Sequence, residues 1–138
     1  MNTGKLGEEV VAQWLIERGG EILARRWRWQ RGEIDLIGID RDTLLSIEVK
    51  TRNRSNLDAD GLLAVTPQQQ ARIATTAQLF LVKHPHLANY PCRFDVAIVR
   101  HQPIGRTIFA TPLHQMTDLN SGECLLLLDY IESAFDSI

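Results

Sequence analysis

The order of amphipathic and apolar segments predicts an α/β domain with a mixed β-sheet flanked by helices, in the order helix, three strands, helix, strand. Residues 3–18 repeat apolar side chains at helical spacing, with Asn2 or Thr3 as the cap and Gly19-Gly20 as the end. Residues 21–50 hold three short, strand-like runs. Thr66-Pro67 begins a second helix that runs to about residue 83, and residues 93–100 form the next strand.

The C-terminal third gives weaker patterns. A strand near residues 107–111 is expected to pair with residues 93–100. Residues 123–136 suggest a short strand followed by a helical turn, although their periodicity does not separate strand from helix. At 138 residues the chain suits a single domain, with a core over 3–111 and a C-terminal extension over 112–138.

Composition is that of an ordinary globular protein, with 44% hydrophobic and 23% charged residues. The longest uninterrupted apolar run, Leu125–Leu128, is far too short to span a membrane, and the N-terminus lacks the pattern of a signal peptide. Cys92 and Cys124 show no metal-ligand spacing. We therefore expect a cytoplasmic protein with no membrane partner.

Residues 32–52 predict a β-hairpin with an unusual charged face. Two apolar-rich runs flank a polar turn at residues 40–43. If the turn is centred between Arg41 and Asp42, Asp35 faces Glu48 and Glu33 faces Lys50. Side chains alternate along a strand, so these four share one face. The other face is expected to hold Ile34, Leu36, Leu45, Ile47 and Val49.

Two directly opposed carboxylates, with Cβ atoms about 4.5–5.5 Å apart, repel each other unless a cation lies between them. Mg²⁺ prefers oxygen ligands and keeps waters for a substrate. Asp35 and Glu48 are therefore candidate metal ligands, and Asp58 and Asp60 of the following loop are weaker ones. The alternative is a solvated hairpin face held by cross-strand Glu–Lys pairs.

Five motifs stand out along the chain: Gly4-x-x-Gly7-Glu8 with Ala12, Ile22-Leu23-Ala24-Arg25, Gly32-Glu33-Ile34-Asp35-Leu36-Ile37, Glu48-Val49-Lys50-Thr51-Arg52 and Arg93-Phe94-Asp95-Val96. Together they resemble the YraN-like family of small bacterial endonucleases, within the PD-(D/E)xK nuclease superfamily. Ile34 stands where the superfamily name has Pro, which is common in this family. Two departures from the family matter: Ser46-Ile47 replaces its aromatic-Val pair, and Gln69 replaces a Lys.

The resemblance implies a restriction-endonuclease-like core and Mg²⁺-dependent hydrolysis of nucleic acid. DNA is the favoured substrate, including branched repair or recombination intermediates. Asp35 and Glu48 would hold Mg²⁺, for which Mn²⁺ should substitute, and Lys50 would stabilise developing charge or position water. Glu8 would add an acid from the first helix. Alternatively, it faces solvent in the first turns of the helix, where the helix dipole favours a negative charge. Supporting roles are expected for Glu33, which would pair with Lys50, and for Gln69. Asp95 is expected to be structural.

The charge pattern predicts where nucleic acid would bind. Formal net charge is −2, so the arginines must act locally. Trp27 and Trp29 alternate with the arginines of residues 25–31. They could stack on bases, or could instead cover a core edge or a homodimer surface. The alternative function is a catalytically silent binding or interaction module on the same fold. The candidate nucleic-acid-binding residues are Arg25, Arg26, Arg28, Arg31, Arg52 and Arg54.

Overall fold

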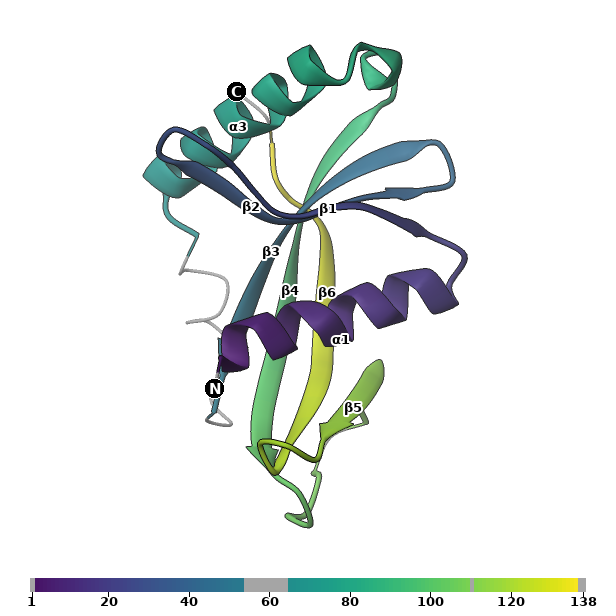
Figure 1. Ribbon diagram of the computed structural model, residues 1–138, viewed down its shortest axis with the longest axis vertical. Helices are drawn as coiled ribbons and strands as arrows, with labels where there is room; N and C mark the ends of the chain where they lie inside the picture. The colour runs from purple at the N-terminus through teal and green to yellow at the C-terminus, as the bar shows by residue number, and fades with distance from the viewer. Residues whose placement is uncertain (1, 54–64, 110, 137–138) are drawn as a thin grey trace.

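The computed structural model describes residues 2–53, 65–109 and 111–136, so Arg54, Asp58 and Asp60 lie outside the described residues. The fold is α/β, with a long sheet and two main helices (Figure 1). The elements are α1 (Thr3–Glu17), β1 (Glu21–Trp29), β2 (Gly32–Asp40), β3 (Thr43–Arg52), α3 (Pro67–Lys83), the 3₁₀ turn η1 (Pro85–Leu87), β4 (Cys92–Pro103), β5 (His114–Asp118) and β6 (Glu123–Phe135).

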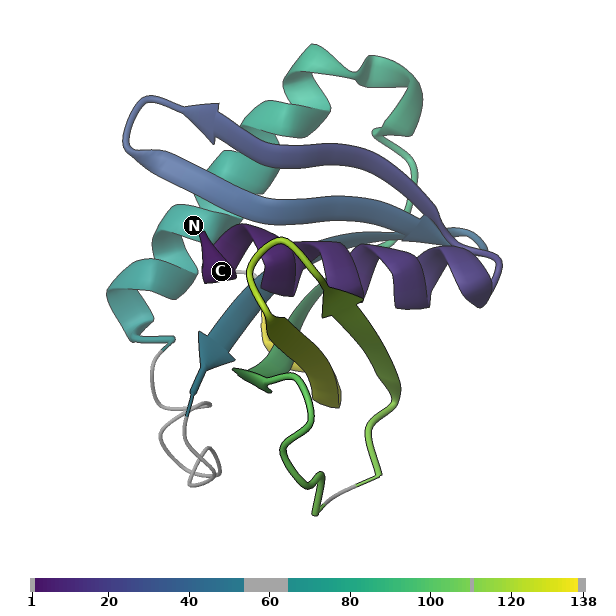
Figure 2. The ribbon, with the colours of Figure 1, turned by 60° about the horizontal axis from the view of Figure 1, so that its bottom comes forward.

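Six strands form one sheet in the order β1-β2-β3-β4-β6-β5. Strands β3 and β4 run parallel, and the other neighbours are antiparallel, which confirms the predicted mixed sheet. The parallel pair requires a crossover connection, and α3 supplies it. The sheet twists strongly, so that the β1–β2 end is rotated well away from the β5–β6 end (Figure 2).

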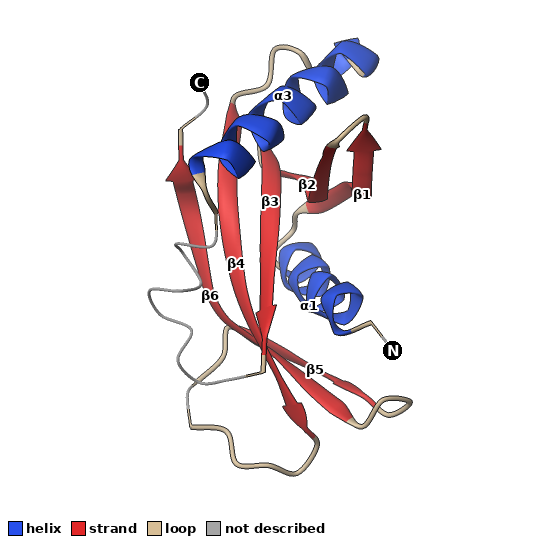
Figure 3. Ribbon diagram, turned by 90° about the vertical axis from the view of Figure 1, so that its left-hand side faces the viewer, coloured by secondary structure: helices blue, strands red, loops and turns tan. Residues whose placement is uncertain are grey.

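Helices cover both faces of the sheet, which corrects the expectation that the hairpin has a single apolar face. Leu36 and Ile47 pack in the cluster that contains α1, whereas Ile37 and Leu44 pack in the cluster that contains α3. Ile34, expected beside Leu36, belongs to the α3 cluster. Strands covered on both sides need apolar residues at successive positions, which conceals the period-two alternation. The two helices are seen beside the sheet in Figure 3.

Local sequence signals set both helix starts as predicted. The Asn2 side chain accepts the Lys5 backbone N–H at 3.1 Å. Thr66 caps α3, and Gln69 completes a capping box with it. Gly19 follows α1 with φ +90°, the left-handed conformation that favours glycine after a helix. Neither helix has the combination of length and apolar character that a membrane crossing requires.

The C-terminal expectations were wrong in two places. Residues 107–109 and 111 are not in a strand; Phe109 is 87% exposed, so its apolar character reflects no buried position. The strand that follows is β5, at His114–Asp118. The predicted helical turn is also absent, because β6 continues to Phe135, where it pairs with Phe94 of β4. Pairing with β4 therefore overrides local propensity here.

Candidate active site

The register of the β2–β3 hairpin is the predicted one. Asp40 pairs with Thr43 around a turn at Arg41 and Asp42, and the register continues to Leu36 opposite Ile47. The next position along would place Asp35 against Glu48, where the backbone pairing ends. There the Asp35 carboxylate replaces a backbone acceptor, since its Oδ2 accepts the backbone N–H of Val49 at 2.8 Å.

The structure brings Asp35 and Glu48 together as a partly buried carboxylate pair. Burial raises the pKa of Asp35 to about 8, and a hydrogen bond with Glu48 and its negative charge act in the same direction. The Val49 N–H opposes this rise by stabilising the ionised form. Without a cation, the pair therefore retains a proton near neutral pH.

Lys50 lies beside the pair. Its Nζ is 3.8 Å from Glu48 Oε2, and the two side chains are 13% and 17% exposed. The expected pairing of Glu33 with Lys50 was wrong: the Glu33 carboxylate instead lies 3.4 Å from Arg28 Nε. Arg28 is the direct partner of Glu33 in the β1–β2 ladder, whereas the regular β2–β3 pairing has ended before this point.

Glu8 enters from α1 and is buried, at 8% exposure, which contradicts the solvent-facing alternative. Gly7 allows this approach, because a Cβ at that position would overlap the Thr51 hydroxyl of β3. Arg26 Nε donates to Glu8 Oε1 at 2.8 Å. Burial raises the pKa of Glu8, and the charge of Asp35 adds to the rise while Arg26 opposes it.

Three of the predicted nucleic-acid-binding arginines already have acidic partners. Arg25 pairs with Glu9 at 2.7 Å, Arg26 with Glu8, and Arg28 with Glu33. Arg52 donates to its neighbouring Thr51 carbonyl at 3.0 Å. The remaining described member of the set is Arg31.

Trp27 and Trp29 differ in their surroundings. Trp27 packs at the edge of the α3-side core and meets Phe80 edge to face, with ring centroids 5.2 Å apart. The interpretation that the tryptophans cover a core edge is therefore correct for Trp27. Trp29 instead lies at the end of β1, with Lys83 Nζ 4.1 Å from its ring centroid.

A polar cleft with a volume of about 240 Å³ opens next to Glu48. Gln69 lines it, but the Gln69 side-chain oxygen is already committed to the Thr66 backbone N–H at 3.0 Å. Sequence reasoning missed Arg72, which lies one helical turn after Gln69 and brings a cation to the same cleft. The signal was available as an i, i+3 spacing. The lining residues are Arg31, Gly32, Glu33, Glu48, Gln69, Arg72 and Ile73.

The donor set suits a hard divalent ion that keeps much of its water. Among residues 2–53, 65–109 and 111–136, no group of three or more His, Cys, Asp or Glu side chains converges in metal-binding geometry. Two carboxylates do converge, and Mg²⁺ is commonly bound through one or two carboxylates plus waters and substrate phosphates. Asp35 and Glu48 therefore fit the ion, while Glu8 is held by Arg26.

Asp95 lies outside this site, as expected for a structural acid. It is fully buried on β4. Arg93 donates to both its oxygens, at 2.9 and 3.0 Å, the Tyr130 hydroxyl donates at 2.6 Å and the Ser133 backbone N–H at 3.0 Å. The network ties β4 to the end of β6.

The chain belongs to the family described as Uncharacterised protein family UPF0102, whose model matches residues 7–99. A UPF0102 protein of Acaryochloris marina is 44% identical over 156 residues, covering 98% of this chain and 90% of the relative. A UPF0102 protein of Synechococcus is 41% identical, with coverage of 98% and 90%. One from Thermosynechococcus vestitus is 46% identical, covering 73% of this chain and 82% of the relative.

Proposed function

We propose that this protein is a metal-dependent endonuclease that hydrolyses phosphodiester bonds in nucleic acid, with a restriction-endonuclease-like core of the PD-(D/E)xK type. The observation that supports the proposal most is the Asp35–Glu48 pair, in which burial and the neighbouring Glu48 carboxylate raise the pKa of Asp35 to about 8. Such a pair is unfavourable for folding unless a cation binds between the two carboxylates.

Asp35 and Glu48 would hold Mg²⁺, and Mn²⁺ should replace it. The bound ion would polarise the scissile phosphate and acidify a water molecule. The Val49 N–H fixes the orientation of Asp35, so that the carboxylate is aimed before the ion arrives. Lys50, 3.8 Å from Glu48, would place its ammonium group against the charge that develops on the phosphate.

The surrounding charges would support the pair and the substrate. Glu8 and Arg26 are hydrogen-bonded to each other, and the charge of Glu8 interacts with that of Asp35. Because Arg26 holds the Glu8 carboxylate in place, Glu8 would orient a water molecule beside the carboxylate pair. Arg31 and Arg72 line the polar cleft with Glu48, where they would meet the phosphates next to the cleaved one. We favour DNA as the substrate.

A cleavage screen tests the proposal. Purified wild-type protein should cut linear or branched nucleic acid with Mg²⁺ or Mn²⁺ and not with EDTA. Asp35→Asn should reduce the rate at least about 100-fold, as expected when a metal ligand is lost. Asp40→Asn, at the other end of β2, is the matched control and should retain activity. Nucleic-acid binding with no metal-dependent cleavage would establish the silent binding module instead.

A further inference from the structure

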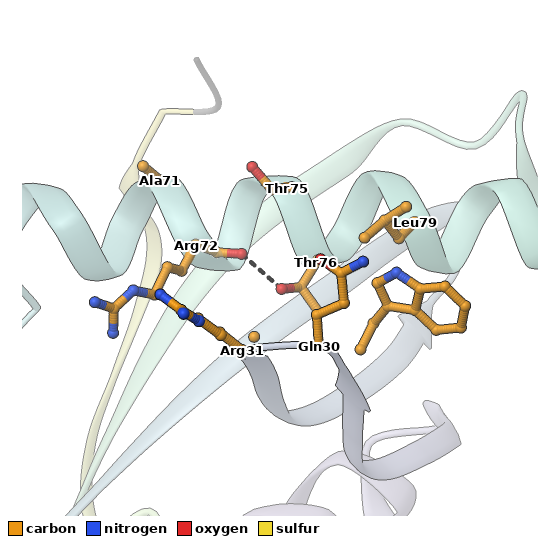
Figure 4. Close-up of a pocket in the computed structure, with 9 residues that line it drawn as sticks. Gln30, Arg31, Ala71, Arg72, Thr75, Thr76 and Leu79 are labelled. Carbon is orange, nitrogen blue, oxygen red and sulfur yellow. Dashed lines mark hydrogen bonds between the residues drawn. The ribbon is translucent and has the colours of Figure 1, made fainter.

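A second pocket lies beside the polar cleft, between the β1–β2 turn and α3. Its volume is about 240 Å³. Arg31 and Arg72 gather at one end of it and Leu79 lies at the other, with Gln30 between them (Figure 4). Its lining residues are Trp29, Gln30, Arg31, Gly32, Ala71, Arg72, Thr75, Thr76 and Leu79.

The two pockets are neighbours, because both are lined by Arg31, Gly32 and Arg72. Gly32 lets the start of β2 lie close against α3, since a Cβ there would overlap the Thr76 hydroxyl. Glu48 lines the polar cleft and Trp29 lines the second pocket, and the two guanidinium groups are common to both.

The Trp29 and Leu79 end of the second pocket suits a flat heteroaromatic ring. Trp29, over one face of which the Lys83 ammonium lies, offers aromatic surface, and Leu79 offers aliphatic surface. The exposed Gln30 lies in the turn with φ 55° and brings a side-chain amide that can donate to and accept from a base edge. The Thr76 hydroxyl is occupied by the Arg72 carbonyl at 2.6 Å, so it does not compete for the ligand. An inorganic anion would use the arginines but gain nothing from Trp29.

We propose that this second pocket binds an unpaired nucleobase next to the cleaved phosphate, with Arg31 and Arg72 holding the phosphate between them. The order of acid pair, cations and aromatic surface follows the order of scissile phosphate, neighbouring phosphate and base along one strand. Bases inside a continuous duplex are stacked and paired, and extracting one costs about a few kcal/mol. The substrate is therefore a single-stranded or branched segment. This inference rests on the proposed nuclease function.

Binding measurements test the pocket. Fluorescence anisotropy in EDTA would compare a short single-stranded DNA with the matched duplex on the full-length protein. Trp29→Ala should weaken single-strand binding about 5- to 100-fold, the effect of removing one stacking aromatic, and leave duplex binding unchanged. Trp29→Phe retains an aromatic ring and should stay within about threefold of wild type.

A second pair of variants guards against misfolding of Trp29→Ala. Ala71→Phe fills the pocket from an exposed helix position and should also weaken single-strand binding. Gln78→Phe, equally exposed on α3 but outside the lining, should bind as wild type does. Equal losses on single strand and duplex, or no loss in either variant, would overturn the nucleobase pocket.

Cleavage on the same protein separates the two proposals. Suppose that metal-dependent cleavage is unchanged in Trp29→Ala and Ala71→Phe and is equal on duplex and single strand. That result would contradict the nucleobase pocket and support the nuclease. Trp29-dependent single-strand binding without cleavage in Mg²⁺ or Mn²⁺ would keep the nucleobase pocket and remove the nuclease.

Discussion

Asp35 on β2 and Asp95 on β4 belong to the same sheet, yet their surroundings are opposite. Asp95 is fully buried and accepts hydrogen bonds from a guanidinium, a phenol and a backbone N–H. Asp35 accepts one backbone N–H and otherwise faces the carboxylate of Glu48, which helps to raise its pKa. One acid is surrounded by donors, and the other is set against a like charge.

The difference separates a structural acid from a functional one. Buried carboxylates that stabilise a fold are paired and fully hydrogen-bonded, as Asp95 is. A carboxylate pair without a cation opposes folding of the ligand-free protein, and such local conflict tends to mark functional sites. Mutations at the two aspartates should therefore change stability in opposite directions.

The largest effect is expected at Asp95. Asp95→Asn leaves the Arg93 guanidinium without its charged partner and disturbs the bonds to Tyr130 and Ser133. We expect a loss of about 3 kcal/mol in the free energy of unfolding, measured by urea denaturation. Asp42→Asn, in the exposed hairpin turn, should change it by less than about 0.5 kcal/mol. Similar values for the two variants would remove the structural role of Asp95.

The pH dependence of stability should reveal Asp35. The folded pKa of about 8 lies above the unfolded value, so the native state holds a proton that the unfolded chain has lost. Stability should therefore fall as pH rises from about 4 to about 8, by on the order of a few kcal/mol. Asp35→Asn removes this contribution, and its urea unfolding curves should vary less with pH. Superimposable pH profiles would show that Asp35 titrates normally.

Removing a single donor to Asp95 should have an intermediate effect. Tyr130→Phe deletes the hydroxyl that donates to Asp95 at 2.6 Å and should lower the free energy of unfolding by about 2 kcal/mol. Tyr90→Phe is a suitable control, because the Tyr90 hydroxyl makes no hydrogen bond within the described part of the chain. Thermal or urea unfolding of both variants measures the difference. An unchanged stability of Tyr130→Phe would mean that Arg93 and the Ser133 N–H satisfy the carboxylate without the phenol.

Among the variants of the two acid sites, the smallest change in stability is expected for Glu48→Gln. The substitution keeps the shape of the side chain and removes the charge that faces Asp35. At pH 8 the metal-free protein should be as stable as wild type or more stable, by up to about 1 kcal/mol, while its affinity for divalent ions falls. A loss of several kcal/mol would instead identify Glu48 as the ion-pair partner that Lys50 needs.

The hairpin at the centre of the site could be predicted because local rules determine it. A two-residue turn fixed the register, and the register determined that Asp35 would approach Glu48. The helix starts followed from Asn2 and the Thr66-Pro67 signal for the same reason. These features depend on residues a few positions apart, where sequence patterns are most informative.

Features that depend on distant segments could not be predicted. Glu33 bonds to Arg28 because β1 is its neighbour, which the hairpin pattern alone does not show. Burial of Glu8 was expected only from the resemblance, because it depends on how closely α1 approaches β3 at Gly7 and no local pattern shows that. The last strand, β6, is fixed by pairing with β4 and not by its own composition.

The most direct test of the proposed metal site is calorimetric titration with Mn²⁺ at about pH 7, in two buffers of different ionisation enthalpy. Because the Asp35–Glu48 pair holds a proton at this pH, wild-type protein should bind the ion and release close to one proton. Asp35→Asn should lose the binding and the proton release together, and Asp40→Asn should lose neither. Unchanged Mn²⁺ binding by Asp35→Asn, or wild-type binding without proton release, would contradict the assignment of this carboxylate pair as the metal site.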